Sequence, residues 1–351
     1  MYPKIVINTN KFKHNLKIIT DICHKKGISV MGVSKVFCAD HNLVSILIDE
    51  NIDYIADSRM ENLESISTNI PKVLLRIASY GDAERIVLNS DISLNSELVT
   101  IERLNSFSSK HGLIHGIIIM VDLGDLREGI FKEEEMFDTV KNVLEFDNIQ
   151  LKGIGTNLTC FGGIIPTVEM LKRLIDIKNK LEKQFNITLD IVSGGNSSSL
   201  DLLVNDKVPV GINNLRLGES IVLGRETAYG SFIEGTYSDI FTLEAEIIEL
   251  KNKPSMPIGK IGMNAFGKKP EFIDKGIMKR AILAIGKQDV DFKELIPYDT
   301  IDIIGSSSDH IIVDVTDSVD DYEVGDIIKF KLTYSSILSL MTSKYVSKVY
   351  E

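Results

Sequence analysis

Short apolar runs alternate with amphipathic stretches from about residue 28 to residue 218. The runs are rich in β-branched residues and almost unbroken, which is typical of strands buried in a parallel sheet. The stretches between them carry apolar residues at helical spacing, most clearly over residues 169–183. Alternation of strand and helix predicts parallel pairing. The eight runs occupy residues 28–33, 52–56, 72–77, 91–94, 114–121, 149–155, 188–192 and 211–217.

Eight strand–helix units predict a closed (β/α)8 barrel of the TIM type, with an open doubly wound sheet as the competing topology. After about residue 230 the pattern changes to strand-like runs separated by turn residues, and helical periodicity returns only over residues 334–340. We therefore expect an α/β barrel over residues 1–232 and a second, mostly β domain over residues 233–351. The runs of this second domain occupy residues 244–250, 281–285, 300–304, 311–315 and 327–332.

The composition is that of a soluble globular enzyme. Of the 351 residues, 44% are hydrophobic and 25% are charged. The net charge of -11 opposes binding to nucleic acid, although backbone N–H groups can still hold the phosphate of a small cofactor. No apolar stretch is long enough to cross a membrane, and the start lacks the apolar core of a signal peptide.

Cysteine and histidine usage narrows the chemistry further. Cys23, Cys38 and Cys160 are too few and too scattered for a disulfide framework or a zinc site. No two histidines stand at metal-ligand spacing. We expect reduced thiols, a cytoplasmic location and no catalytic metal.

The candidate with the most specific chemistry is Lys35, which follows the apolar run at 28–33. A lysine at the carboxyl end of a barrel strand lies where such folds carry out catalysis. Its amine, partly shielded from water, can attack an aldehyde and form a Schiff base. The alternative is a lysine that ends its strand in solvent.

Other polar residues follow the remaining runs, and in a barrel all of them would meet at one rim. The turn Ser193–Ser199 contains two glycines and several hydroxyl groups before a helix-like stretch, which favours phosphate binding over a plain serine cap. An amine and a phosphate cradle on one rim indicate pyridoxal phosphate. The polar residues that follow the runs are Asp57, Arg59, Arg76, Asn95, Asp122, Arg127, Asn157, Ser193, Asn196, Ser197 and Arg216.

These residues resemble the alanine racemase family, pyridoxal-phosphate enzymes built from a barrel and a β domain. The likeness covers most of the chain and is closest to the branch of amino-acid racemases that includes ornithine racemase. The matching segments are Val33–Ser34–Lys35, residues 56–62, Val121–Asp122–Leu123–Gly124–Asp125–Leu126–Arg127, Asn214–Leu215–Arg216–Leu217–Gly218, residues 306–309 and Tyr334.

The resemblance implies a role for each matched residue. Lys35 would hold the cofactor and act as one base, and Arg127 would lie near the cofactor's ring oxygen and the substrate carboxylate. Arg216 would face the ring nitrogen. The other expected contacts are Asn157, Ser193, Asn196, Ser197, Gly218, Glu219 and Tyr334 with the cofactor, and Asp309 with the substrate. The family also implies a homodimer in which each β domain completes the other subunit's site.

Two departures from the family pattern bear on mechanism and substrate. The family's Gly-Tyr-x-Asp-Gly segment is missing, and Lys260 stands roughly where its tyrosine, the second base, would be. The acidic residues Asp125, Glu128 and Asp309 would suit a substrate with a distal ammonium, such as ornithine or lysine. The alternative for these acids is a solvated acidic loop.

We therefore predict an amino-acid racemase that acts on a small or basic amino acid, with ornithine favoured. An alanine racemase, a decarboxylase of basic amino acids with the same fold, and a non-catalytic cofactor-binding module are the alternatives. Arg216 argues against the decarboxylase, because such enzymes usually place a carboxylate at the ring nitrogen. The extra domain argues against the binding module.

Overall fold

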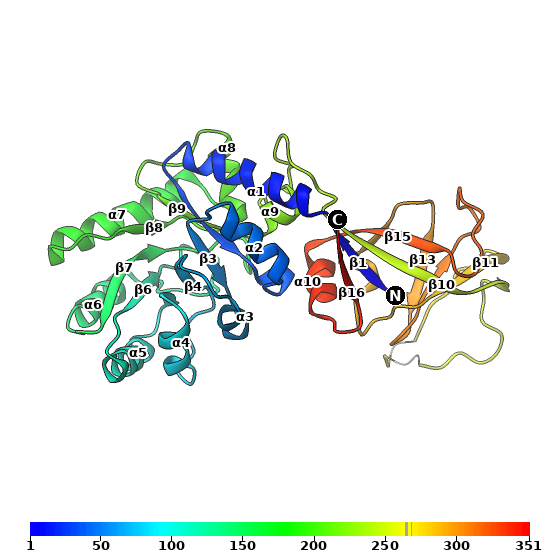
Figure 1. The fold of residues 1–351 in the computed structure, drawn as a ribbon, viewed down its shortest axis with the longest axis horizontal. Coiled ribbons are helices and arrows are strands. Elements are labelled where there is room, and N and C mark those ends of the chain that lie inside the picture. Colours follow the sequence, from blue (N-terminus) through cyan, green and yellow to red (C-terminus); the bar gives the residue numbers. More distant parts are fainter. Residues whose placement is uncertain (264–265, 268) are drawn as a thin grey trace. The chain divides into compact units, whose positions relative to one another are not determined.

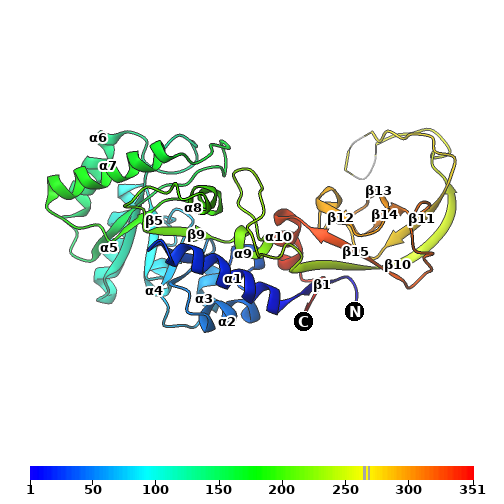
Figure 2. The same cartoon turned by 90° about the horizontal axis from the view of Figure 1, so that it is seen from above.

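The computed structural model describes residues 1–263, 266–267 and 269–351. The chain forms two compact units, one over Lys11–Ser238 and the other over Met1–Asn10 together with Asp239–Glu351. Figures 1 and 2 show the first unit, blue to green, as a barrel wrapped by helices and the second, yellow to red, as a sheet-rich body. This confirms the expected fold class.

The first unit is a closed barrel of eight strands that all pair in parallel (Figure 1). Each predicted run contributes one strand, including the run at 91–94, and the open-sheet alternative is therefore wrong. The barrel strands are β2 (Ser29–Val33), β3 (Tyr54–Asp57), β4 (Lys72–Leu74), β5 (Ile92–Asn95), β6 (His115–Met120), β7 (Ile149–Gly155), β8 (Ile191–Ser193) and β9 (Asn214–Leu217).

Helices connect successive strands and cover the outside of the barrel. Their apolar faces pack on the outward side chains of the strands, while inward residues such as Met31, Val73 and Ile118 form a separate core inside the barrel. The helices of this unit are α1 (Thr9–His24), α2 (His41–Asp49), α3 (Met60–Ser65), α4 (Ala83–Asn89), α5 (Leu98–His111), α6 (Glu133–Val143), α7 (Val168–Phe185), α8 (Leu200–Val204) and α9 (Glu219–Leu223).

Helix α7 shows how the sequence sets these elements. The hydroxyl oxygen of Thr167 accepts a bond from the Met170 N–H at 3.2 Å and caps the start of the helix. Asn186, the residue after the helix, has a left-handed φ of 54° and ends it. Between these ends, one face is buried by Leu171, Leu174, Ile177 and Leu181, which the pattern over residues 169–183 predicts.

The second unit is built on one sheet with the strand order β12-β15-β10-β11-β14-β13, in which neighbours pair antiparallel. An α-helix, α10 (Tyr334–Thr342), follows β15 as the sequence predicts. The strands are β1 (Lys4–Ile7), β10 (Phe241–Pro254), β11 (Ile277–Leu283), β12 (Leu295–Pro297), β13 (Asp302–Ser306), β14 (Ile311–Asp314), β15 (Ile327–Leu332) and β16 (Ser347–Tyr350).

The first ten residues differ from the expectation, which placed them in the barrel domain. Strand β1 pairs antiparallel with β10 and parallel with β16. Strands β1 and β16 are the first and last of the described strands. These ladders assign Met1–Asn10 to the β-rich unit, and the boundary after the barrel falls at Ser238 rather than at residue 232. A four-residue strand with such distant partners gives no local signal of the sheet to which it belongs.

Two further findings concern what the described residues lack. No described helix combines the length and the apolar character needed to span a membrane. Within the same residues, no group of three or more His, Cys, Asp or Glu side chains is arranged to hold a metal ion.

Candidate active site

Lys35 lies at the carboxyl end of β2, at the rim where barrel enzymes carry their active sites. The strand ends at Val33, and Lys35 opens a short 3-10 helix, Lys35–Phe37. The side chain is half-buried, so its amine is partly shielded from water. This location favours the Schiff-base interpretation over a fully solvated lysine.

The backbone around Lys35 is held by the buried carboxylate of Asp57, at the end of β3. The Ser34 hydroxyl donates to it at 2.6 Å, and the Arg59 N–H and Asn62 amide donate at 2.9 and 3.0 Å. Burial nevertheless raises the pKa of Asp57 above its usual value. Asp57 thus ties the turn beside Lys35 to the neighbouring strand.

Arg216, in β9, is a buried cation held by neutral partners. Its guanidinium donates to the Ser193 hydroxyl at 2.6 Å, to the Thr156 carbonyl at 2.7 Å and to the Asn157 side-chain oxygen at 3.3 Å. Burial lowers the pKa of Arg216 to about 10, so it keeps its charge at neutral pH. Its side chain is 5% exposed, and no carboxylate among the described residues forms an ion pair with it.

The turn after β8 takes the glycine-dependent conformation that its sequence predicts. Gly195 has a φ of 118°, and a Cβ there would lie 2.6 Å from the Ser199 hydroxyl. That hydroxyl donates to the Gly194 carbonyl at 2.7 Å and closes the turn. A side chain at Gly195 would therefore both strain the backbone and displace Ser199.

Asn196 and Ser197 lie in this turn and connect it to the neighbouring strands. The Asn196 amide donates to the Asn157 side chain at 3.0 Å and to the Leu158 carbonyl at 2.9 Å. The Ser197 hydroxyl donates to the Ser220 hydroxyl at 3.1 Å. The structure therefore brings the predicted residues Asn157, Ser193, Asn196 and Arg216 into one hydrogen-bonded network, while Ser197 connects the same turn to α9.

Gly218 lies directly beside the Lys35 strand. A Cβ on Gly218 would lie 3.0 Å from the Cβ of Val33, so only a glycine permits this approach without displacement. The next residue, Glu219, opens α9, and its carboxylate accepts from the Arg225 guanidinium at 2.7 Å. The Glu219 side chain is thus occupied, which leaves its backbone N–H as the group that could meet a phosphate.

Arg127 follows β6 and is more exposed than Arg216. It pairs through two bonds with the adjacent Glu128, while the buried Asp125 accepts from the N–H groups of Phe161 and Ile164 at 3.0 and 3.2 Å. These two acids, which the sequence analysis associated with a distal ammonium, therefore have internal partners.

Three predicted residues belong to the β-rich unit. Lys260 is exposed in the segment between β10 and β11, and Tyr334 is the half-buried first residue of α10. Asp309 lies in the exposed turn between β13 and β14, where the Ser307 and Ser308 hydroxyls donate to it at 3.2 and 3.1 Å. The bond from Ser308 lowers the pKa of Asp309. Their proposed roles remain predictions.

Two further contributors after β7 were not predicted from the sequence. Thr156 supplies the carbonyl that accepts from Arg216, and Cys160 lies with its sulfur 3.3 Å from the Asn196 amide nitrogen. Cys160 lies three residues after Asn157, so reading that much further past the run would have found it, whereas Thr156 contributes a backbone carbonyl that no residue type signals. The Arg216 guanidinium also lies within electrostatic range of Cys160, Arg127 and Glu128.

Comparison with known proteins places this site in a family. The family model of the alanine racemase N-terminal domain matches residues 7–225. The chain is 50% identical over 350 residues to the ornithine racemase of Acetoanaerobium sticklandii, covering 99% of both proteins. The chain belongs to the alanine racemase family.

A second relative supports the assignment, and a solved structure shares the fold. A lysine racemase of Thermotoga maritima is 40% identical over 355 residues, covering 100% of this chain and 99% of that protein. The crystal structure of an alanine racemase from Bartonella henselae with covalently bound pyridoxal phosphate has the same fold, with a TM-score of 0.75 at 18% identity and 99% coverage of each chain. Alanine racemase homologues depend on pyridoxal phosphate.

Proposed function

We propose that this protein is a pyridoxal-phosphate-dependent racemase of basic amino acids and that ornithine is its preferred substrate. The observation that carries the proposal is the buried Arg216, held only by neutral groups on the same barrel rim as Lys35. Membership of the alanine racemase family and full-length similarity to two amino-acid racemases confirm the predicted class of enzyme.

The rim residues fit the cofactor chemically. Three buried side-chain atoms here, the Thr156 and Ser198 hydroxyls and the Asn157 amide nitrogen, have no hydrogen-bond partner among the described residues. An unpartnered buried polar group costs about 1–3 kcal/mol, so these atoms favour a ligand rich in oxygen. Lys35 would hold the aldehyde, and the Gly218–Glu219 backbone with Ser197 and Tyr334 would hold the phosphate.

Arg216 decides which reaction this site supports. Bound pyridoxal phosphate supplies an electron sink that acidifies the Cα–H bond of an attached amino acid. Because Arg216 remains a donor at neutral pH, it would face the ring nitrogen without giving up a proton. A ring nitrogen that stays unprotonated weakens this sink and limits side reactions such as transamination. This pairing favours racemisation over decarboxylation.

Racemisation needs a proton carrier on each face of Cα. Lys35 would serve one face with its ε-amine, and Lys260, in place of the family's tyrosine, would serve the other. Arg127 would hold the substrate carboxylate, since its guanidinium is 43% exposed. We also propose a homodimer in which Lys260, Asp309 and Tyr334 complete the partner's barrel site, as in the family pattern.

The choice of substrate rests on the two curated relatives. The ornithine racemase is 50% identical to this chain and the lysine racemase 40%. Asp309, ionised and exposed at its turn, is the proposed partner of a distal ammonium. The reduced thiols of the three cysteines fit a cytoplasmic location.

The test is incubation of the holoenzyme with L-ornithine, L-lysine and L-alanine in deuterated water, followed by chiral chromatography and mass spectrometry. We expect D-ornithine carrying one deuterium at Cα, a higher kcat/KM for ornithine than for lysine, and little turnover of alanine. Release of carbon dioxide instead would identify a decarboxylase. A preference for alanine would contradict the substrate proposal alone.

A matched pair of variants ties this activity to the rim. Lys35→Ala should lose both D-product and the visible absorption band of the bound cofactor, because the amine that holds the aldehyde is gone. Lys25→Ala, at an exposed lysine just after α1, should keep both. Full activity in Lys35→Ala would overturn the assignment.

A further inference from the structure

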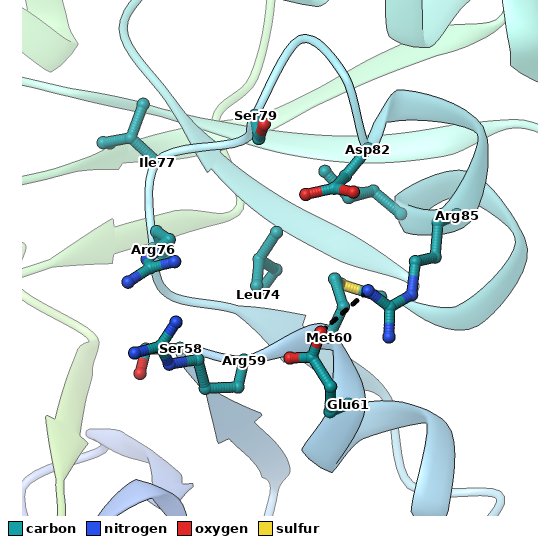
Figure 3. Close-up of a pocket in the computed structure, with 11 residues that line it drawn as sticks. Ser58, Arg59, Met60, Glu61, Leu74, Arg76, Ile77, Ser79, Asp82 and Arg85 are labelled. Atoms are coloured by element: carbon teal, nitrogen blue, oxygen red, sulfur yellow. Dashed lines mark hydrogen bonds and ion pairs between the residues drawn. The ribbon is translucent and has the colours of Figure 1, made fainter.

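A small open cavity lies above the carboxyl ends of β3 and β4. Figure 3 shows its walls, which come from the segments that follow these two strands and from α4. Nothing in the proposed reaction uses this cavity. The residues that line it include Ser58, Arg59, Leu74, Arg76, Ser79 and Asp82.

One side of the cavity carries two arginines, Arg59 and Arg76. Arg59 follows β3 and Arg76 follows β4, and Figure 3 shows their guanidinium groups lying close together. Both side chains are exposed, and neither forms an ion pair with a described residue. Two neighbouring like charges repel, and a bound carboxylate would relieve that repulsion.

The nearby acids are already committed elsewhere. Glu61 and Glu64 both accept from Arg85, at 2.9 and 2.6 Å. The third acid nearby, Asp57, accepts from Ser34, Asn62 and the Arg59 backbone. The protein therefore pairs Arg85 directly with two acids, whereas Arg59 has only a longer-range interaction with the charge of Glu61 and Arg76 has no ion pair among the described residues.

The other side of the cavity carries one carboxylate, that of Asp82. It occupies the position before α4 where an aspartate usually caps the helix, yet its side chain makes no capping bond. The side chain is exposed and forms no ion pair with a described residue. Figure 3 shows Asp82 across the cavity from the two arginines, with Ser79 beside it.

We propose that this cavity binds a free amino acid as a zwitterion at a site separate from Lys35, with its carboxylate on Arg59 and Arg76 and its ammonium on Asp82. The arginines would attract a dianion, but Asp82 would repel it. Asp82 would attract a dication, but the arginines would repel it. Only a ligand carrying both charges satisfies both sides. The inference does not depend on the racemase assignment.

The test is calorimetric titration of the holoenzyme with N,N-dimethylglycine, a zwitterion whose tertiary amine cannot condense with an aldehyde. We expect saturable binding at least about tenfold tighter than that of acetate, because acetate uses only the arginines. Arg76→Gln and Arg59→Gln should each weaken both ligands about tenfold or more. Asp82→Asn should weaken N,N-dimethylglycine but not acetate, which can only gain when the repelling carboxylate is removed.

Controls separate this site from bulk charge and from Lys35. Arg173→Gln removes the same charge from the exposed face of α7 and should leave binding unchanged. Lys35→Ala should also leave binding unchanged. Arg76→Lys keeps the charge but loses the forked donor, so it should fall between wild type and Arg76→Gln. No saturable binding, equal binding in Arg76→Gln, or loss of binding in Lys35→Ala would each overturn the proposal.

Discussion

Arg216 shows how one side chain can set the chemistry of a site. Its three partners are a hydroxyl, a carbonyl and an amide oxygen, so its positive charge is solvated by the protein but not cancelled. A buried cation with neutral partners is costly to maintain, and this cost is characteristic of functional positions. The charge would be directed at the ring nitrogen of the cofactor.

Changing the sign of this side chain should change the product. In Arg216→Glu, a carboxylate at the ring nitrogen would hold a proton there and strengthen the electron sink. We expect racemisation to fall on the order of 10²-fold, as when one preorganised electrostatic group is removed, and a keto acid from transamination to appear. Chiral chromatography with a keto-acid assay measures both products.

The neutral variant Arg216→Gln separates charge from packing. It should lose rate without forming keto acid, since it neither donates as strongly nor holds a proton at the ring. Unchanged product purity in Arg216→Glu would contradict the role at the ring nitrogen. Cofactor absorbance should persist in both variants, because Lys35 and the phosphate contacts remain.

At this scale, the sequence predicted which residues lie on the rim but not which atoms meet. Arg216 could be placed because it follows an apolar run and parallel strands end at one rim. Its bond to the Thr156 carbonyl joins positions 60 residues apart, and no local pattern encodes such a contact. The ion pair between Glu128 and its neighbour Arg127 could not be predicted either, because the sequence does not show in which direction a charged side chain points.

At the scale of the strands, the two ends of the barrel serve different purposes. The carboxyl ends carry the candidate site, whereas the start of β6 carries a buried polar pair. There the ring of His115 lies 2.8 Å from the Ser93 hydroxyl of β5. Burial lowers the pKa of His115 to about 4, so the ring is neutral in the folded protein. The pair would support stability rather than catalysis.

His115 should make the barrel sensitive to acid. An unfolded histidine titrates near pH 6.5, so between pH 6.5 and about 4 the unfolded chain binds a proton that the folded ring refuses. Stability is therefore full above pH 6.5 and falls by about 3 kcal/mol as the pH drops through this window. Urea unfolding from pH 7 to pH 4 measures the slope.

Two variants isolate this contribution. His115→Gln cannot titrate, so its stability should fall less steeply between pH 6.5 and 4 than that of the wild type. Ser93→Ala removes the hydroxyl that meets His115 and that also accepts from the Asn95 amide at 2.9 Å, so it should be less stable by at least about 1 kcal/mol while keeping the acid slope. Parallel curves for His115→Gln and wild type would show that the ring is not held neutral.

Whether a strand could be predicted from the sequence depended on its length and on the elements around it. Buried runs such as 149–155 were found because their apolar content alone identifies them. Strands β1, β12 and β16 were missed because each is short and none stands in the strand–helix alternation that reveals the equally short barrel strands. Strand β4 was predicted over 72–77 but ends at Leu74, and residues 75–77 turn toward the rim that carries Arg76.

At the scale of the whole molecule, the candidate residues are divided between two units. Lys35 and Arg216 belong to the barrel, whereas Lys260, Asp309 and Tyr334 belong to the β-rich unit. If sites are shared, a working centre needs the barrel of one subunit and the β-rich unit of its partner. Two inactive subunits with defects in different units could then form one intact site together.

Subunit mixing tests this division directly. Lys35→Ala and Lys260→Ala should each be inactive, since one lacks the cofactor lysine and the other the second base. Random pairing makes half the dimers mixed, and each mixed dimer has one intact site of two, so about a quarter of wild-type racemisation should return. Mixing Lys35→Ala with Arg216→Gln should restore nothing, because both defects lie in barrels and no barrel in the mixed dimer is whole. Recovery in neither mixture, with tags confirming that subunits exchange, would mean that each chain completes its own centre.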